Sequence, residues 1–259
     1  MTPVCPPGHD LLADKVVVVT AAAGTGIGSA TARRCLEEGA TVVVSDWHER
    51  RLGETREQLA ADHGDDRVWS AVCDVTDERQ VQDLVAGAVS RYGRMDVMVN
   101  NAGLGGEKSV LDMTDDEWSR VLDVTLGGTF RCTRAALKQL VAQGGGGAVV
   151  NNASVIGWRA QAGQAHYAAA KAGVMAFTRC SAIDVAAHGI RVNAVAPSLA
   201  MHPFLSKVTS EELLTELTGR EAFGRAAEPW EVANVIVFLA SDYSSYLTGE
   251  VVSVSSQHP

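Results

Sequence analysis

A glycine-rich turn that follows an apolar run is the feature that most constrains the fold. Val16–Val19 is short, β-branched and wholly apolar, which is typical of a strand buried in a parallel sheet. A helical pattern begins directly after the turn, whose central residues are Gly24, Thr25, Gly26, Ile27 and Gly28. Free N–H groups and the helix dipole favour a phosphate there, and glycine allows close approach. The segment predicts a phosphate-binding unit, although its spacing is not G-x-G-x-x-G and a ligand-free turn stays open.

A carboxylate ends the second predicted strand, which covers residues 40–45. Asp46 can accept hydrogen bonds from both ribose hydroxyls of an adenosine, and it would repel a 2′-phosphate. Thr25 stands where a basic side chain could hold that phosphate. Both residues favour NAD over NADP, and Arg50 and Arg51 would weaken this preference if they fold back toward the site.

A serine, a tyrosine and a lysine form the predicted catalytic set. Tyr167 and Lys171 are four residues apart, so they share one face of a helix. A phenol ionises near ~10, and a neighbouring ammonium lowers that pKa toward the range of a general base. Ser154 adds a hydroxyl that could hold the oxygen of a reacting alcohol. A tyrosine and a lysine at this spacing also occur by chance in helices, so neighbouring motifs have to support the assignment.

These residues resemble the short-chain dehydrogenase/reductase family, and the resemblance runs from Leu11 to Val254. The other motifs that carry it are Cys73-Asp74-Val75, Asn100-Asn101-Ala102-Gly103, Asn193–Pro197, Phe238–Ser241 and Leu247–Gly249. The resemblance implies that Ser154 holds the substrate oxygen, Tyr167 exchanges its proton, and Lys171 binds the nicotinamide ribose. It implies further cofactor contacts from Asp74 and Val75 at the adenine, from Asn101, Ala102 and Gly103 at its ribose, and from Pro197 at the nicotinamide.

Four positions depart from the family pattern. Ala22 replaces the first glycine of the turn, where a Cβ disfavours a positive φ by roughly 1–2 kcal/mol. Thr125 replaces the usual catalytic asparagine; its hydroxyl could still hold a relay water, with less reach. His202 replaces a threonine that commonly meets the cofactor amide, and Ser255–Pro259 replaces an acidic-glycine ending. These departures indicate a specialised branch that keeps its catalytic set.

Composition limits the possible partners. A net charge of −9 argues against non-specific binding to nucleic acid or to an anionic membrane. The five cysteines are scattered and form no C-x-x-C spacing, so we expect buried thiols and neither a disulfide framework nor a metal site. Met1–Lys15 lacks the apolar core of a signal peptide, and no apolar run approaches the ~20 residues of a membrane helix. We therefore expect a cytoplasmic enzyme.

Strand and helix patterns alternate along the chain of 259 residues. They predict an α/β fold: a single Rossmann-type doubly wound parallel sheet with helices on both faces. Residues 1–10 are expected to form a flexible arm and residues 11–259 one catalytic domain, with a substrate lid at about 198–228. Capping boxes are predicted at Thr114–Glu117 and Thr209–Glu212. Expected strands cover 16–19, 40–45, 68–73, 97–100, 148–152, 191–196 and 250–254, and expected helices include 51–61, 78–92, 114–143, a helix from Tyr167 to about 187, and 229–240.

The loop after Ser154 and the start of the lid are the segments expected to contact the substrate. Trp158, Met201 and Phe204 could line an apolar pocket for a bulky ring, or they could be lid core or subunit contacts. Arg159 and Lys108 could meet a carboxylate or coenzyme A phosphates, or be solvated surface charges. Three segments, 153–161, 197–202 and 253–259, resemble actinobacterial enzymes of steroid C/D-ring breakdown. That resemblance implies NAD⁺-dependent oxidation of a hydroxy-hydrindane CoA thioester.

Two other functions remain open from the sequence. One is an NADPH-dependent 3-oxoacyl thioester reductase, against which Asp46 and Thr25 argue. The other is a non-catalytic dinucleotide sensor or scaffold, against which Ser154, Tyr167 and Lys171 argue. The family resemblance also implies a homotetramer that packs through the helices containing Asp115 and Tyr167.

Overall fold

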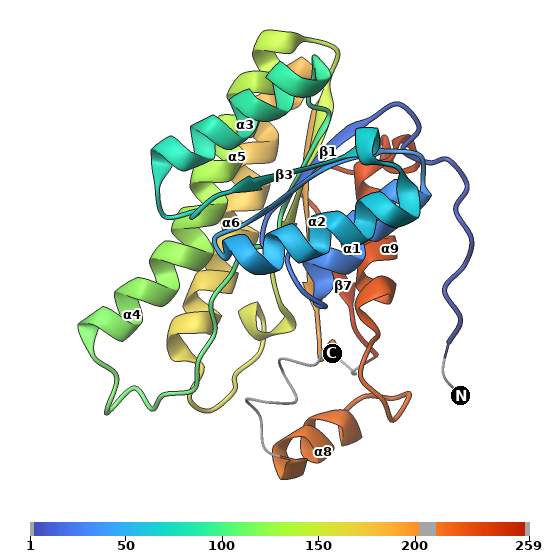
Figure 1. Cartoon of the computed structure of the whole chain (residues 1–259). Coiled ribbons are helices and arrows are strands. Elements are labelled where there is room, and N and C mark those ends of the chain that lie inside the picture. The colour runs from blue at the N-terminus through green and yellow to red at the C-terminus, as the bar shows by residue number, and fades with distance from the viewer. Residues whose placement is uncertain (1–2, 202–210, 257–259) are drawn as a thin grey trace.

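Parallel strands form one seven-stranded sheet in the computed structural model, which describes residues 3–201 and 211–256 (Figure 1). The strands are β1 (Val16–Val19), β2 (Thr41–Asp46), β3 (Val68–Val72), β4 (Val97–Asn100), β5 (Gly147–Asn152), β6 (Ile190–Pro197) and β7 (Val251–Val254). The helices are α1 (Ile27–Glu37), α2 (Glu49–His63), α3 (Glu78–Tyr92), α4 (Asp115–Leu122), α5 (Gly128–Gln143), α6 (Ala165–Val185), α8 (Glu211–Gly219) and α9 (Pro229–Ala240). The predicted fold class is confirmed.

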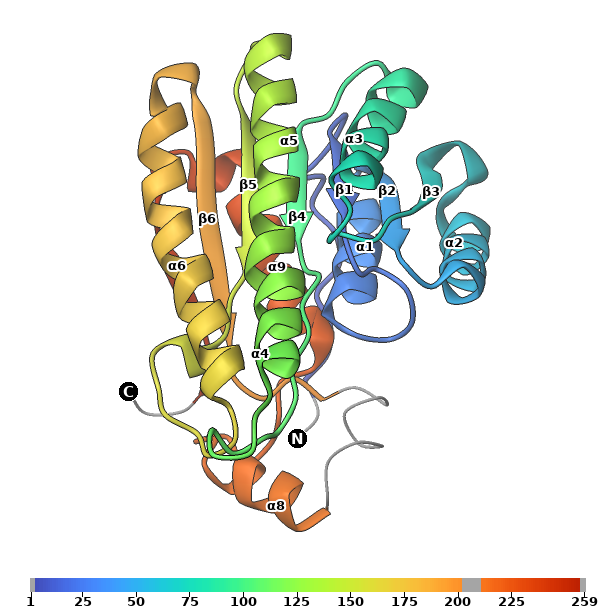
Figure 2. The ribbon, with the colours of Figure 1, turned by 90° about the vertical axis from the view of Figure 1, so that its left-hand side faces the viewer.

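Alternation along the apolar strands places a hydrophobic core on each face of the sheet. Val17 and Val19 of β1 belong to one core, which also contains residues of α1, α2 and α9. Val18 points the other way, into a core that contains residues of α3, α5 and α6. Figure 2 shows α3, α5 and α6 in front of the sheet and α1 and α9 behind it. Burial on both faces is why these strands are continuous apolar runs.

The strand order β3-β2-β1-β4-β5-β6-β7 reverses direction between β1 and β4. In sheets of this kind a ligand binds at that reversal, outside the carboxyl ends of the strands. The glycine turn, Asp46, Asn101, Ser154 and Pro197 all lie at or just beyond those ends. The fold therefore gathers residues that are distant in sequence at one edge of the sheet.

The predicted long helix at 114–143 is divided in two. Its start is confirmed as a capping box, in which the Glu117 N–H donates to Thr114 Oγ1 at 3.2 Å. Between α4 and α5 lies a π-helical segment, Asp123–Gly127. The Thr129 hydroxyl donates to the Thr125 carbonyl at 2.7 Å, and two adjacent glycines follow Leu126, which weakens regular helix there. The local pattern does not predict this interruption, and Thr125 lies inside it.

Most other predicted bounds agree within two residues; α3, β4 and α9 match in full. The start of the second predicted capping box, Thr209, lies outside the described residues, and α8 begins at Glu211.

The two ends of the predicted lid meet where Ala200 pairs with Ala227. The described part of the N-terminal arm contacts α1, since Arg34 donates to the Pro6 carbonyl at 3.2 Å. The flexibility of the arm and the lid function stay predictions. None of the described helices is long and apolar enough to cross a membrane.

Arg191 carries a stabilising contact that can be tested. Its guanidinium donates to the carbonyls of Leu239, Ala240 and Ser241 and to Ser244 Oγ, at 2.6–3.3 Å, and so satisfies the C-terminal carbonyls of α9. Arg191→Met removes these four hydrogen bonds; the Ser244 hydroxyl still donates to the Leu239 and Ser241 carbonyls, but the Ala240 carbonyl loses its donor. We therefore expect this variant to lower the free energy of unfolding by about 2 kcal/mol in urea titrations. Arg50→Met, which breaks an exposed pair with Glu54, should cost less than about 0.5 kcal/mol. Equal losses would contradict this role for Arg191.

Candidate active site

The glycine turn has the shape that a phosphate ligand needs. Gly24 has φ +90°, and α1 begins after Gly26 with no side-chain cap and no acidic residue in its first turn. A Cβ added at Gly24 or Gly26 would meet nothing within 4 Å, so the space above the turn is open. Uncapped N–H groups beside open space fit the diphosphate of a dinucleotide.

The backbone beside Ala22 has its positive φ at the preceding residue. Ala21 has φ +49°, whereas Ala22 is not in the left-handed region. Gly28 packs tightly against Ala21, because a Cβ on Gly28 would lie 2.3 Å from the Ala21 carbonyl oxygen and 2.5 Å from Asn101 Nδ2. The turn therefore accommodates alanine at position 22 without a positive φ at that residue.

Asp46 faces the glycine turn. Its Oδ2 accepts from the Ala23 N–H at 3.3 Å, and its Oδ1 accepts from the His48 N–H at 2.9 Å. Thr55 of α2 accepts from the Gly24 N–H at 3.0 Å and so joins α2 to the turn. Arg50 is exposed and pairs with Glu54 at 2.6 Å. Arg51, one helical turn before Thr55, has a buried Nε with no partner among the described residues.

The predicted adenine contacts lie after β3. One carboxylate oxygen of Asp74 accepts from the Thr76 N–H at 2.9 Å and from the Thr76 hydroxyl at 2.8 Å, so it closes a local turn. Val75 is buried, and a Cβ on Gly128 would lie 2.6 Å from its Cγ2. This packing requires a glycine at the start of α5. The role of Asp74 and Val75 at an adenine stays a prediction.

The serine, tyrosine and lysine come together at the carboxyl end of β5. Ser154, which is 8% exposed, precedes the short 3₁₀ turn Val155–Gly157 and accepts from the Ile156 N–H at 3.3 Å. Tyr167 and Lys171 lie on the first turns of α6, with Lys171 Nζ 5.6 Å from the centroid of the phenol ring. A hydrogen bond joins the side chains of Ser154 and Tyr167. The spacing of the three residues thus produces one compact group.

Burial sets the protonation of this group. It raises the pKa of Tyr167 above its ordinary value, and the hydrogen bond with Ser154 lowers that pKa by a smaller amount. Lys171 is 3% exposed, and its ammonium donates to the neutral carbonyl of Asn152 at 2.5 Å. Desolvation lowers the pKa of Lys171 to about 8. The net direction at Tyr167 is therefore opposite to the lowering expected from the sequence, because desolvation of a phenolate outweighs the favourable contacts.

A glycine-rich loop, residues 103–106, covers this group. Of the loop residues, only Gly103 is among the predicted site residues. A Cβ on Gly103 would lie 3.4 Å from Lys171 Nζ, and one on Gly105 would lie 3.7 Å from Tyr167 Cδ2. Glycine therefore lets the loop lie directly against α6. The closeness to side chains some 60 residues later in the chain has no local sequence signal.

Thr125 fastens that loop. Its hydroxyl accepts from the Leu104 N–H at 3.0 Å and donates to the Leu104 carbonyl at 3.1 Å. Since a hydroxyl has one hydrogen, any further partner of Thr125 would have to donate to its remaining lone pair. The predicted role in holding a relay water stays a prediction, and the observed role is positional.

The predicted substrate residues are only partly described. Trp158 is 50% exposed beside the turn that follows Ser154. The backbone of Arg159 donates to the Val155 carbonyl at 3.1 Å, and that of Met201 to the Ala227 carbonyl at 2.9 Å. Lys108 pairs with Glu117 at 3.8 Å. His202 and Phe204 lie outside the described residues, so their cofactor and substrate roles stay predictions.

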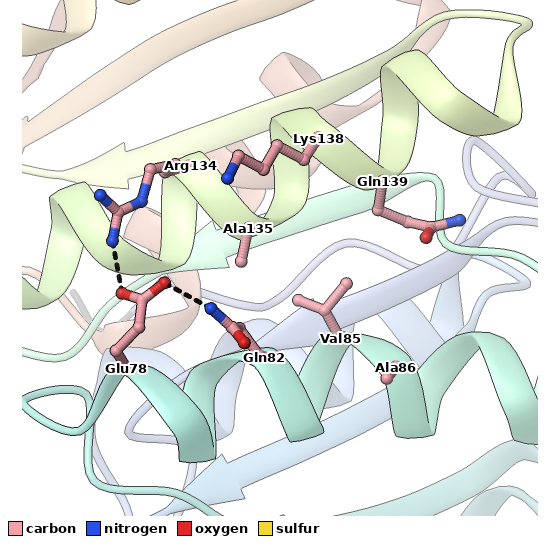
Figure 3. A pocket seen from close by; sticks show the side chains of 8 residues that line it. All are labelled: Glu78, Gln82, Val85, Ala86, Arg134, Ala135, Lys138 and Gln139. Atoms are coloured by element: carbon pink, nitrogen blue, oxygen red, sulfur yellow. Dashed lines mark hydrogen bonds and ion pairs between the residues drawn. The ribbon is translucent and has the colours of Figure 1, made fainter.

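A separate groove of about 410 Å³ lies between α3 and α5. Figure 3 shows Arg134 and Lys138 of α5 facing Glu78 and Gln82 of α3, with an ion pair of 2.5 Å between Arg134 and Glu78. None of the predicted site residues lines this groove. Among the residues that the structure describes, no group of three His, Cys, Asp or Glu side chains could hold a metal ion.

The burial of Lys171 predicts a pH effect on stability. The pKa of Lys171 is about 8 in the folded chain against an ordinary value of 10.5, so the folded state binds fewer protons between these values. The cost of burying the ammonium is fully present below pH 8 and is lost as the pH rises through this window. Measured by urea unfolding, the stability of the wild type relative to Lys171→Met should increase across it by on the order of 3 kcal/mol.

Lys138→Met is the matched control, because Lys138 is exposed on α5. Its stability difference from the wild type should stay flat over the same pH range. A flat difference for Lys171→Met as well would show that this ammonium is not desolvated in solution.

Known proteins resemble this chain along nearly its whole length. The family described as enoyl-(acyl carrier protein) reductase matches residues 21–256. A (5R,7aS)-5-hydroxy-7a-methyl-1-oxo-2,3,5,6,7,7a-hexahydro-1H-indene-carboxyl-CoA reductase of Mycobacterium tuberculosis is 68% identical over 97% of this chain and 96% of that protein. A 3-oxoacyl-(acyl-carrier-protein) reductase FabG of Thermotoga maritima is 40% identical over 94% of this chain and 97% of that protein.

A solved structure agrees with these sequence relatives. The crystal structure of a short chain dehydrogenase from Mycobacterium smegmatis superposes with a TM-score of 0.89 at 60% identity. It covers 100% of this chain, and the match covers 99% of that one. Together with the parallel sheet and the group of Ser154, Tyr167 and Lys171, these matches show that the chain belongs to the short-chain dehydrogenase/reductase family of oxidoreductases.

Proposed function

We propose that this protein interconverts a secondary alcohol and a ketone with NAD, and that its substrate is a ring hydroxyl of a hydrindane CoA thioester in steroid breakdown. The observation that carries the proposal is the 68% identity to the indene-carboxyl-CoA reductase over 97% of this chain. The compact group of Ser154, Tyr167 and Lys171 supplies the chemistry that such a reaction needs. A CoA thioester is accordingly the proposed partner, with no role for nucleic acid or a membrane.

The reaction follows from the geometry of that group. When bound, a nicotinamide dinucleotide supplies the redox chemistry, taking or returning a hydride. Ser154 holds the substrate oxygen and steadies its changing charge. In oxidation, Tyr167 takes the proton of the alcohol; in reduction, it returns a proton to the ketone oxygen. Lys171, fixed by the Asn152 carbonyl, keeps a positive charge beside the phenol and favours its phenolate.

The cofactor contacts are proposed on the same basis. The uncapped start of α1 and its open glycine turn would hold the diphosphate, and the carboxylate of Asp46 would accept from the adenosine ribose. The further contacts proposed are those of Asp74, Val75, Asn101, Ala102, Gly103, Tyr167, Lys171, Pro197 and His202. Asp46 supports NAD over NADP, because a second negative charge at the ribose would be repelled.

An NADPH-dependent 3-oxoacyl thioester reductase is the second candidate. Two observations favour it: the 40% identity to the Thermotoga maritima reductase, and the Nε of Arg51, which is buried without a partner among the described residues. Because Arg51 precedes Thr55 by four residues, it lies on the face of α2 that contacts the glycine turn through Thr55. A 2′-phosphate would be a suitable partner for it.

Cofactor reduction and oxidation decide between the two candidates. Hydroxy-hydrindane CoA thioesters and linear 3-hydroxyacyl-CoA thioesters are supplied with NAD⁺ and NADP⁺, and the ketones with NADH and NADPH. We expect NAD-dependent turnover of the bicyclic thioester, and a fall in kcat of about 10²- to 10⁴-fold in Tyr167→Phe. Turnover restricted to the linear thioesters with NADP(H) would establish the second candidate instead. Tight NAD⁺ binding without turnover of any alcohol would refute both.

A homotetramer is proposed as the working assembly, with α4, α5 and α6 at a subunit interface. Phe130 is 41% exposed on α5, packs edge-on against Phe177 of α6 at 5.9 Å, and has Arg134 stacked over it at 4.4 Å. Ile183, further along α6, is 79% exposed. Large exposed apolar side chains on these two helices favour burial by another subunit.

Light scattering tests this assembly. We expect four times the mass of one chain for the wild type and a smaller species for Phe130→Glu, because a charge would be buried in the interface. Val4→Glu, at an exposed position of the N-terminal arm, should leave the mass unchanged. A monomeric wild type would contradict the proposal.

Cell fractionation would test the proposed cytoplasmic location, which the five free thiols support.

A further inference from the structure

Asn152, the last residue of β5, points toward the glycine-turn side of the sheet. The preceding side chain, Asn151, donates to Thr178 of α6 at 2.9 Å and accepts from Asn100 at 2.8 Å on the opposite side. Successive side chains of a strand alternate between faces, so Asn152 faces the side of α1 and α9. There its Nδ2 donates to Asn101 Oδ1 at 2.9 Å.

Asn101 extends this contact to the start of the glycine turn. Its Nδ2 donates to the carbonyls of Thr20 and Ala21, at 3.2 and 3.0 Å. Ala21 is the residue with φ +49°, a conformation that an alanine adopts only when its surroundings hold it. The two amides of Asn152 and Asn101 therefore form a hydrogen-bonded link from β5 to the turn that is proposed to bind the diphosphate.

The backbone of Asn152 holds the other end of the link. Its carbonyl accepts from Lys171 Nζ at 2.5 Å, and Lys171 is only 3% exposed. A lysine side chain has four carbons and many rotamers, so a single fixed carbonyl has a large effect on where its charge rests. One residue thus contacts both the proton-transfer group and, through Asn101, the glycine turn.

Packing alone does not account for an asparagine at this position. Asn152 Oδ1 is buried and has no hydrogen-bond partner among the described residues. An unpaired buried acceptor is destabilising, whereas a leucine has nearly the same shape and carries no such cost. The compensating interaction that the structure shows is the N–H donation to Asn101.

We propose that Asn152 is a positioning residue, whose side-chain amide ties the peptide that holds Lys171 to the glycine turn through Asn101. In this role the residue acts through Lys171 and the turn. It makes the location of the ammonium depend on the same hydrogen bonds that shape the phosphate-binding turn. The inference rests on the oxidoreductase activity proposed above.

Asn152→Leu keeps the shape of the side chain and removes the tie. We expect kcat to fall about tenfold or more, because small displacements of a catalytic group have large effects on rate, while the KM for the alcohol stays within about twofold. We also expect the Kd of NADH, measured by fluorescence titration, to rise about three- to tenfold through loss of one hydrogen bond that supports the turn. If Asn152→Leu does not fold, Asn152→Ala is measured in its place.

Asn234→Leu is the matched control. Asn234 of α9 accepts from Arg34 Nε at 2.8 Å, so this variant also loses one amide contact, at a position outside the proposed site. It should lower the Tm and leave kcat and the Kd of NADH unchanged. If Asn152→Leu lowers the Tm in the same way, with kcat and Kd within twofold of the wild type, the positioning role is refuted. A wild type without turnover would refute the proposed function instead, and the Kd comparison would still decide the role of Asn152.

Discussion

Burial of the central strands on both faces is the constraint on which the rest of the structure depends. Val17 and Val19 enter one core while Val18 enters the other, and the same alternation recurs in β2, β4 and β5. A strand that is apolar on both sides is buried on both sides, so helices cover each face, as in other parallel sheets. Polar side chains therefore lie mainly at the ends of the strands. The carboxyl edge is where the chain places them.

The chemistry at that edge is shaped by desolvation. Lys171 is buried against a neutral carbonyl, which is why its pKa falls to about 8, and burial also raises the pKa of Tyr167. Both groups are thereby held nearer to their neutral forms than they would be in water. In such a site a nearby charge acts through a low dielectric and has a larger effect than it would at the surface. A bound cationic nicotinamide would thus favour the phenolate that burial disfavours.

Much of this arrangement was predictable from local patterns. The apolar runs, the capping box at Thr114 and the glycines after Gln143 each carry a short-range signal, and the structure agrees with them. Tyr167 and Lys171 meet because four residues make one helical turn. The π-helical segment around Thr125 was not predictable, since the residues there are compatible with a regular helix and only their contacts with Leu104 and Thr129 show the interruption. Nor was the left-handed conformation of Ala21, which Asn101 supports from 80 residues away.

The sequence by itself determined the class of fold and the order of its elements, and it predicted the three residues of the proposed catalytic group, because these depend on neighbours within a few helical turns or on one strand. The tertiary structure decided how those residues are held. Lys171 rests on Asn152, the loop at Gly103–Gly106 lies over Tyr167, and Thr125 fastens that loop. Each contact joins segments that are distant along the chain, and its energy depends on burial and on a partner that no local pattern specifies.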